Sequence, residues 1–130
     1  MTVGLAAATA NAVLDALCRS VTWTDPAGVW IQLHVGDPGA AGTANTAVET
    51  DRTQAVFGSA AASGAISNTV ALTWSSVAGT EDFTHYSAWD ASSSGNFLFS
   101  GTVTANSVTA GDDFTIPVGD LDVTLTPVAT

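Results

Sequence analysis

Lysine is absent from this 130-residue chain, and Arg19 and Arg52 are its only arginines. Twelve Asp and Glu residues set the formal net charge at −10. Nucleic-acid phosphates and anionic membranes are bound mainly through clustered Lys and Arg, so the composition predicts neither as a partner. The absence of lysine also excludes a phosphate-binding Walker lysine and Schiff-base catalysis.

Cysteine is nearly absent too, because Cys18 stands alone and cannot form an internal disulfide or a thiolate-rich zinc site. No lysine-flanked apolar run opens the chain, so we expect no secretory signal. No run approaches the roughly 18 apolar residues that a helix needs to span a bilayer. Hydrophobic residues still make up 46% of the sequence, which at this length predicts one folded domain.

The stretch 29–39, which reads VWIQLHVGDPG, carries the clearest structural pattern in the chain. Its residues alternate between two faces, as in a strand with one buried side, and it stops at a Gly-Asp-Pro-Gly turn. We expect a core strand with Val29, Ile31, Leu33 and Val35 facing inward and Trp30, Gln32 and His34 facing outward.

Short strands with frequent turn signals follow this stretch, at about the spacing typical of a sandwich or jelly roll. The fold class predicted is mainly β: an antiparallel, jelly-roll-like β-sandwich of about seven or eight strands with one N-terminal α-helix. Residues 1–20 are expected to form a helical docking or oligomer arm, and 21–130 the sandwich. Besides the first core strand, strands are predicted at 21–23, 54–57, 65–67, 69–74, 85–90, 97–103, 114–117 and 121–126, with Val70, Leu121 and Leu125 facing inward.

The helix is predicted over 2–19, with Thr2 as its N-cap and Arg19 near the negative end of its dipole. An Ala-rich helix of this length is marginal alone and needs a surface to dock on, either on its own sandwich or on a neighbouring subunit. The long 36–51 loop is a second docking candidate. The candidate interface residues are Leu5, Val13, Leu17, Trp30 and Trp89.

Catalysis is not expected, because the chain has no strand–Gly-x-Ser-x-Gly–helix motif and no Gly-rich phosphate cradle. A Ser–His pair can be drawn from any sequence this rich in serine. We interpret His34 and His85 as ordinary half-exposed histidines on outward strand faces. No cofactor is predicted.

Two groups of residues could form a binding site or have a purely structural role. Asp112, Asp113 and Asp120 are candidate calcium ligands, but their spacing fits no calcium loop, and turn-forming or solubilising roles are favoured. The outward Trp30 and Trp89 either cover the sheet beneath a helix, loop or subunit, or contact a glycan; covering is favoured.

Several short segments, among them LHVGDPG at 33–39, THYSAWD at 84–90 and NFLFSG at 96–101, form a recognisable series along the chain. Taken in order, they resemble small tail-fibre or minor-tail-like β-sandwich proteins of tailed phages of actinobacteria. The resemblance implies a virion component with no catalytic residues, assembled in the bacterial host cytoplasm and exposed on the particle as a minor tail, tail-fibre or head decoration subunit. Other virion proteins (major capsid or tail) are the expected partners, and a homo-oligomer, by analogy a trimer, is expected. The alternative is a host-surface glycan-binding module. The matching segments are LHVGDPG at 33–39, AVFG at 55–58, ISN at 66–68, LTW at 72–74, THYSAWD at 84–90, NFLFSG at 96–101 and IPVGDL at 116–121.

Overall fold

The computed structural model describes residues 3–126 and 128. Within these residues one helix, α1 (Ala7–Arg19), precedes eight strands. The strands are β1 (Val29–His34), β2 (Thr53–Ala55), β3 (Ala65–Ser67), β4 (Leu72–Trp74), β5 (Glu81–Trp89), β6 (Phe97–Val108), β7 (Phe114–Ile116) and β8 (Asp122–Thr124).

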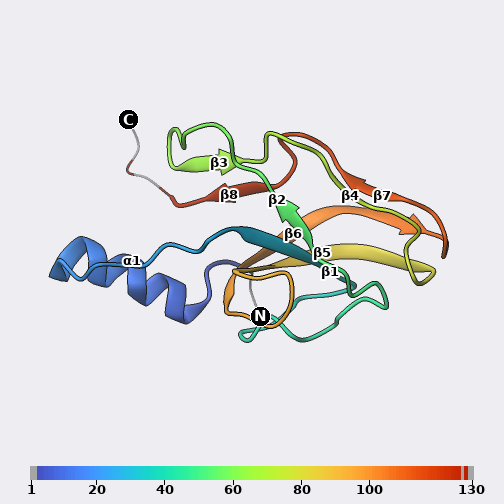
Figure 1. The fold of residues 1–130 in the computed structure, drawn as a ribbon, viewed down its shortest axis with the longest axis horizontal. Coiled ribbons are helices and arrows are strands. Elements are labelled where there is room, and N and C mark those ends of the chain that lie inside the picture. Colours follow the sequence, from blue (N-terminus) through green and yellow to red (C-terminus); the bar gives the residue numbers. More distant parts are fainter. Residues whose placement is uncertain (1–2, 127, 129–130) are drawn as a thin grey trace.

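The strands form two layers. One layer is a four-stranded antiparallel sheet in the order β2-β1-β5-β6, and the other consists of two antiparallel ribbons, β3-β8 and β4-β7. Figure 1 shows both ribbons lying over one side of the larger sheet, while α1 projects from one end of the molecule. The predicted mainly β sandwich with an N-terminal helix is confirmed.

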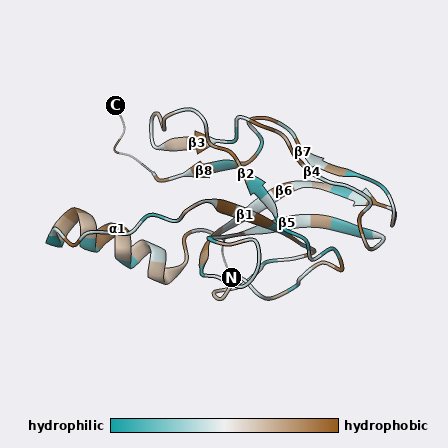
Figure 2. Ribbon diagram, in the orientation of Figure 1, coloured by the Kyte–Doolittle hydropathy of each residue, from teal (hydrophilic) through white to brown (hydrophobic). Residues whose placement is uncertain are grey.

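The core lies between these layers. Ile31 and Leu33 of β1 are fully buried, and their register partners on β5, Ala88 and Tyr86, share the same face. The β4-β7 ribbon closes over them with Phe114, whose ring lies 4.9 Å from that of Phe83 in an edge-on arrangement. Such aromatic pairs contribute about 1 kcal/mol of stabilisation beyond that from the surface area they bury. The strongly hydrophobic start of β1 stands out in Figure 2.

Two register shifts interrupt the pairing of β5 with β6, one between Phe83 and His85 and one between Ala88 and Trp89. A bulge changes which side of the sheet the following side chains face. Phe83 therefore faces the core although its distance along the chain from Tyr86 is odd. Simple alternation could not place both of these residues inside.

The predicted helix start is wrong, because α1 begins at Ala7. Residues 4–6 instead pair with β6: the Ala6 N–H donates to the Leu98 carbonyl, and the Ser100 N–H donates to the Gly4 carbonyl, both at 2.8 Å. The predicted N-cap, Thr2, lies outside the described residues.

Other sequence expectations fail near segment ends. Residues 21–23 form no strand. The helix α1 ends at Arg19, the next residue, Ser20, has a left-handed conformation, and the Val21 N–H donates back to the Asp15 carbonyl. Several strands are also shorter or longer than predicted: β5 begins at Glu81, and β6 continues to Val108. Three predicted inward residues are exposed beyond the strand ends: Val35, Val70 and Leu125.

The turn between β7 and β8 is held by one buried side chain, Asn68, which is 1% exposed. Its amide Nδ2 donates to the carbonyls of Val70 and Pro117 at 2.9 and 3.1 Å. Its Oδ1 accepts from the N–H groups of Gly119 and Leu121, both at 3.0 Å. One amide thus joins β3, the start of β4 and the β7–β8 turn.

Replacing Asn68 with alanine removes one hydrogen-bond partner from each of four backbone groups; the Gly119 N–H and the Pro117 carbonyl keep a backbone partner, at 3.0 and 3.2 Å. We expect Asn68→Ala to lower the free energy of unfolding by about 3 kcal/mol, since buried unsatisfied groups cost about 1–3 kcal/mol each and some regain water. Urea unfolding measures the change. Asn106→Ala, an exposed asparagine on β6, should change it by less than about 0.5 kcal/mol, and equal losses in the two variants would contradict this role for Asn68.

Candidate functional site

The outer face of the four-stranded sheet is covered by the chain's own 36–51 loop. The loop returns to β1, where the Val35 N–H donates to the Asn45 carbonyl at 2.9 Å and the Ala47 N–H to the Leu33 carbonyl at 3.3 Å. At Gly42 the loop lies so close to the ring of Phe97 that an added Cβ would be 2.6 Å from it. The loop therefore serves as a cover for the sheet.

Two carboxylates, the half-buried Glu81 and the buried Glu49, fix the far end of this loop. Glu81 of β5 accepts hydrogen bonds from the N–H groups of Val48 and Glu49. The Glu49 carboxylate, in a side chain only 6% exposed, accepts from the N–H groups of Asp51 and Ala78 at 2.9 and 3.0 Å. These acidic residues satisfy backbone donors and leave few lone pairs for a ligand.

Beneath the loop lies a directional hydrogen-bond chain. His34 and Ser87 are both 0% exposed, so the prediction of a half-exposed His34 is wrong. His34 Nδ1 lies 2.8 Å from the Ala44 carbonyl, which can only accept, so Nδ1 carries the proton. His34 Nε2 then accepts from Ser87 Oγ at 2.7 Å, and Ser87 Oγ accepts from Trp89 Nε1 at 2.8 Å.

A buried Ser–His pair invites comparison with a hydrolase dyad. Here the histidine's second nitrogen meets a backbone carbonyl rather than an orienting carboxylate, and neither side chain is open to a substrate. Burial also lowers the pKa of His34, which keeps the ring neutral. The pair instead fastens the loop to the sheet.

Arg52 covers the outer face of the sheet beside the hydrogen bonds of His34, Ser87 and Trp89. Its guanidinium carbon lies 4.3 Å from the centre of the Trp89 ring, and its Nε donates to Gln32 Oε1 at 3.0 Å. Its Nη1 donates to the carbonyls of Ala91 and Ser94 at 2.9 and 2.7 Å, which ties down the β5–β6 hairpin. Trp89 is left 8% exposed under this cation.

The two tryptophans predicted to face outward do lie side by side, because Trp30 pairs with Trp89 across β1 and β5. Trp30 is half-buried and Trp89 is covered by Arg52. No local pattern indicates that Arg52 reaches Trp89, since 37 positions separate them in the sequence.

The three candidate calcium ligands do not form one cluster, and residues 3–126 and 128 contain no group of three or more metal-binding side chains. Asp112 accepts from the Thr109 N–H and Asp113 from the Ser76 N–H, so both act in turns. Asp120 lies in the β7–β8 turn and lines a separate groove.

The helix α1 contains no buried residue. Among the interface candidates on the N-terminal segment, Leu5 is 36% and Leu17 78% exposed, while Val13 is half-buried. The sequence reading missed Leu14 and Val21, which are 56% and 45% exposed. Their spacing of three and four from Leu17 was the available signal. No helix within the described ranges is long and apolar enough to cross a membrane.

The His34 chain predicts a dependence of stability on pH. Because burial lowers the folded-state pKa of His34 below its ordinary 6.5, the unfolded chain binds more protons between these two pKa values. The stabilisation is complete above pH 6.5 and is lost as the pH falls toward the folded-state pKa, at up to about 1.4 kcal/mol per pH unit.

Urea unfolding from pH 7.5 to 5 measures this loss. His34→Gln should be less stable at pH 7.5 by about 1–3 kcal/mol and should lose most of the slope. The matched control is His85→Gln, which keeps the hydrogen bonds of His34, removes only the smallest of the effects on its pKa and should retain most of the slope. A slope unchanged in His34→Gln would refute the assignment.

The comparison with known proteins agrees with this geometry. The sequence matches the family model described as podophage GP4 fiber I protein gp80 over residues 4–124, a span that contains α1 and all of β1–β8. No curated protein matches it. The resemblance to phage fibre proteins is confirmed at this level, and with it a structural role in the virion. The chain belongs to the podophage GP4 fiber I protein gp80 family.

Proposed function

We propose that the protein is a non-catalytic subunit on the surface of the phage particle, and that it works by protein–protein assembly through α1. The segment resemblance supports phages of actinobacteria as the setting, and the match to a fibre family favours a minor tail or tail-fibre position over head decoration. The observation that carries the proposal is a 13-residue helix with no buried residue.

Such a helix is not stable by propensity alone. Isolated helices of about 12–15 residues are marginal in water even when rich in alanine, and most helical stability in proteins comes from burying one face. The contacts of α1 with its own sandwich involve Ala8, Thr9 and Ala12, which line a shallow recess beside Phe97. The opposite side of α1 remains uncovered within the subunit (Figure 1).

That uncovered side carries a regular seam. Within α1, Ala7, Ala10, Leu14 and Leu17 follow one another at intervals of three, four and three, the spacing of coiled-coil contact positions. The largest of them, Leu14 and Leu17, are 56% and 78% exposed. Figure 2 shows α1 coloured mainly toward the hydrophobic end of the scale.

Charge favours other copies of the same chain as the occupant of this seam. Asp15 and Arg19 are the only charged side chains in the sequence of residues 1–24, and they form an ion pair at 3.0 Å. The whole net charge of −10 therefore lies in the rest of the chain. Copies would repel through their sandwiches but not through their helices. The apolar seam would therefore assemble parallel helices around an axis, and a trimer is our expectation by analogy with other particle subunits.

Leu17→Asp tests self-association, because it places a charge in the seam. We expect the wild-type protein to be oligomeric in sedimentation velocity at micromolar concentration and Leu17→Asp to be monomeric, with an unchanged β-sheet circular dichroism spectrum. The matched control is Val118→Asp, which alters a 60% exposed apolar residue on the β7–β8 turn and should leave the oligomer intact. A monomeric wild-type protein with a fully formed helix would contradict the proposal.

The place on the particle is tested separately. Antibody labelling of virions in electron micrographs should mark fibres or the tail, and phage carrying Leu17→Asp should lose most of the label. Label confined to the head, or full occupancy by Leu17→Asp, would contradict the proposed position or the proposed contact.

A further inference from the structure

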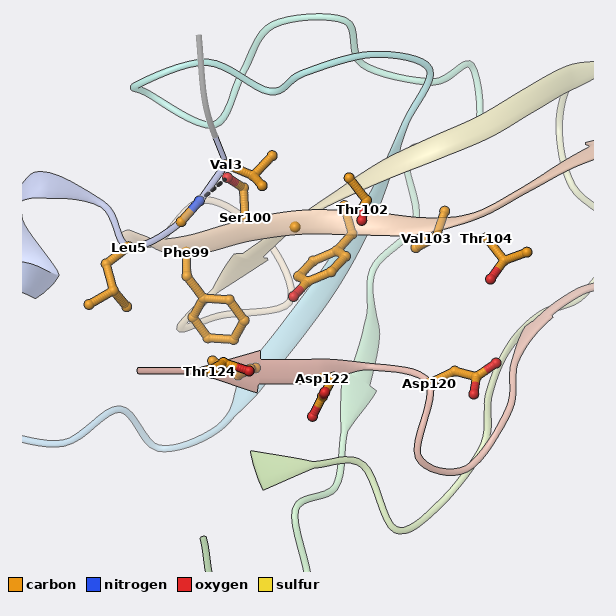
Figure 3. Close-up of a pocket in the computed structure, with 14 residues that line it drawn as sticks. Val3, Leu5, Phe99, Ser100, Thr102, Val103, Thr104, Asp120, Asp122 and Thr124 are labelled. Atoms are coloured by element: carbon orange, nitrogen blue, oxygen red, sulfur yellow. Dashed lines mark hydrogen bonds between the residues drawn. The ribbon is translucent and has the colours of Figure 1, made fainter. Parts of the chain in front are cut away.

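A groove of about 490 Å³ opens between β6 and β8, on the opposite edge of the sandwich from the Arg52 cover. Figure 3 shows Thr102 and Thr104 of β6 along one side of the groove and Asp120, Asp122 and Thr124 along the other; the side chains of Thr102 and Asp122 point away from each other. Phe99 provides an aromatic surface at one end. The groove is open to solvent and polar, unlike the core beside it.

The hydroxyl of Tyr86 is a polar group without a hydrogen bond inside the described fold. The residue is 3% exposed, and its hydroxyl reaches across Gly101, its register partner on β6, where an added Cβ would be 2.5 Å from Oη. Tyr86 lines the groove, and no side chain or backbone group of the described residues forms a hydrogen bond with its hydroxyl. Every fully buried side-chain polar atom in the described chain has a partner. The Tyr86 hydroxyl is thus left facing the groove.

The charges and protonation states of the groove residues restrict which chemical class of ligand can bind. Burial, together with the nearby charge of Asp122, raises the pKa of Tyr86 to about 12, so the phenol can both donate and accept at neutral pH. Two carboxylates and no cationic residue line the groove, which disfavours an anion. No third acidic, histidine or cysteine side chain joins them within the described chain, so a multidentate metal site is not formed.

We propose that this groove binds a neutral saccharide. Carboxylates accept hydrogen bonds from sugar hydroxyls, the hydroxyls of Tyr86 and Thr104 can donate or accept, and the face of Phe99 can lie against the apolar side of a ring. The volume falls within the range of about 300–1,000 Å³ found for small-molecule sites. The site would give a fibre subunit a contact with host glycans, and it does not depend on whether α1 self-associates.

This groove differs from the tryptophan pair as a glycan site. Trp89 lies beneath Arg52 and is 8% exposed, so its ring face is already occupied. The residues of the groove come from residues 3–5, β5, β6, the β7–β8 turn and β8.

Amide chemical shifts in ¹⁵N-labelled protein test the proposal. The probes are glucose, galactose, mannose, N-acetylglucosamine, rhamnose, lactose and maltose, each titrated at millimolar concentrations. At least one sugar should shift the amides of Thr102, Thr104 and Asp122 in a saturable way. Tyr86→Phe, which removes only the hydroxyl, should weaken that binding about tenfold, the effect of one lost hydrogen bond of about 1.4 kcal/mol.

Asp122→Asn should weaken binding similarly, and Asp82→Asn, an exposed aspartate on β5, is its matched control and should not. No saturable shift with any of the sugars, shifts centred on Trp30 and Trp89, or undiminished binding by Tyr86→Phe and Asp122→Asn would each overturn the assignment. Shifts produced by calcium or by a lysine-rich peptide, but not by the sugars, would overturn it as well. Sedimentation of the same samples reports separately on α1.

Discussion

The antiparallel pairing of β1 with β5 is the constraint on which the rest of the structure depends. Because Ile31 and Leu33 lie opposite Ala88 and Tyr86, the inner face of the sheet is apolar and brings the two ribbons into place. The same register puts His34 beside Ser87 on the outer face. One pairing thus fixes the core and also the hydrogen bonds that hold the cover.

The cover explains how a sheet with both faces buried is built from alternating sequence. An outer face with histidine, serine and glutamine would ordinarily meet water. Here each polar group finds a protein partner, and no fully buried side-chain polar atom among the described residues lacks one. A network satisfied throughout is rigid, because moving any member leaves another buried group unpaired. Such rigidity suits a structural component of the virion.

Local patterns predicted the strands and the sandwich, since the alternation in β1 and the Gly-Asp-Pro-Gly turn after it are encoded by neighbouring residues. They failed where distant segments meet. His34 is buried because a loop ten residues away folds over it, and residues 4–6 leave the helix because β6 offers them hydrogen-bond partners. The groove was missed entirely: Tyr86 and Asp122 are 36 positions apart, and only the finished layers place them together.

The segment 4–6 links the two surfaces proposed for assembly and for binding. Its backbone pairs with β6 through Leu98 and Ser100, and it leads directly into α1 at Ala7. Leu5 in the same segment lines the groove. A helix bundle built on α1 would therefore hold each groove at a fixed position near the base of the bundle, without a flexible linker between them. Several copies of a weak site arranged in this way bind a repetitive surface far more tightly than one copy does, so modest affinity in each groove is sufficient for a fibre.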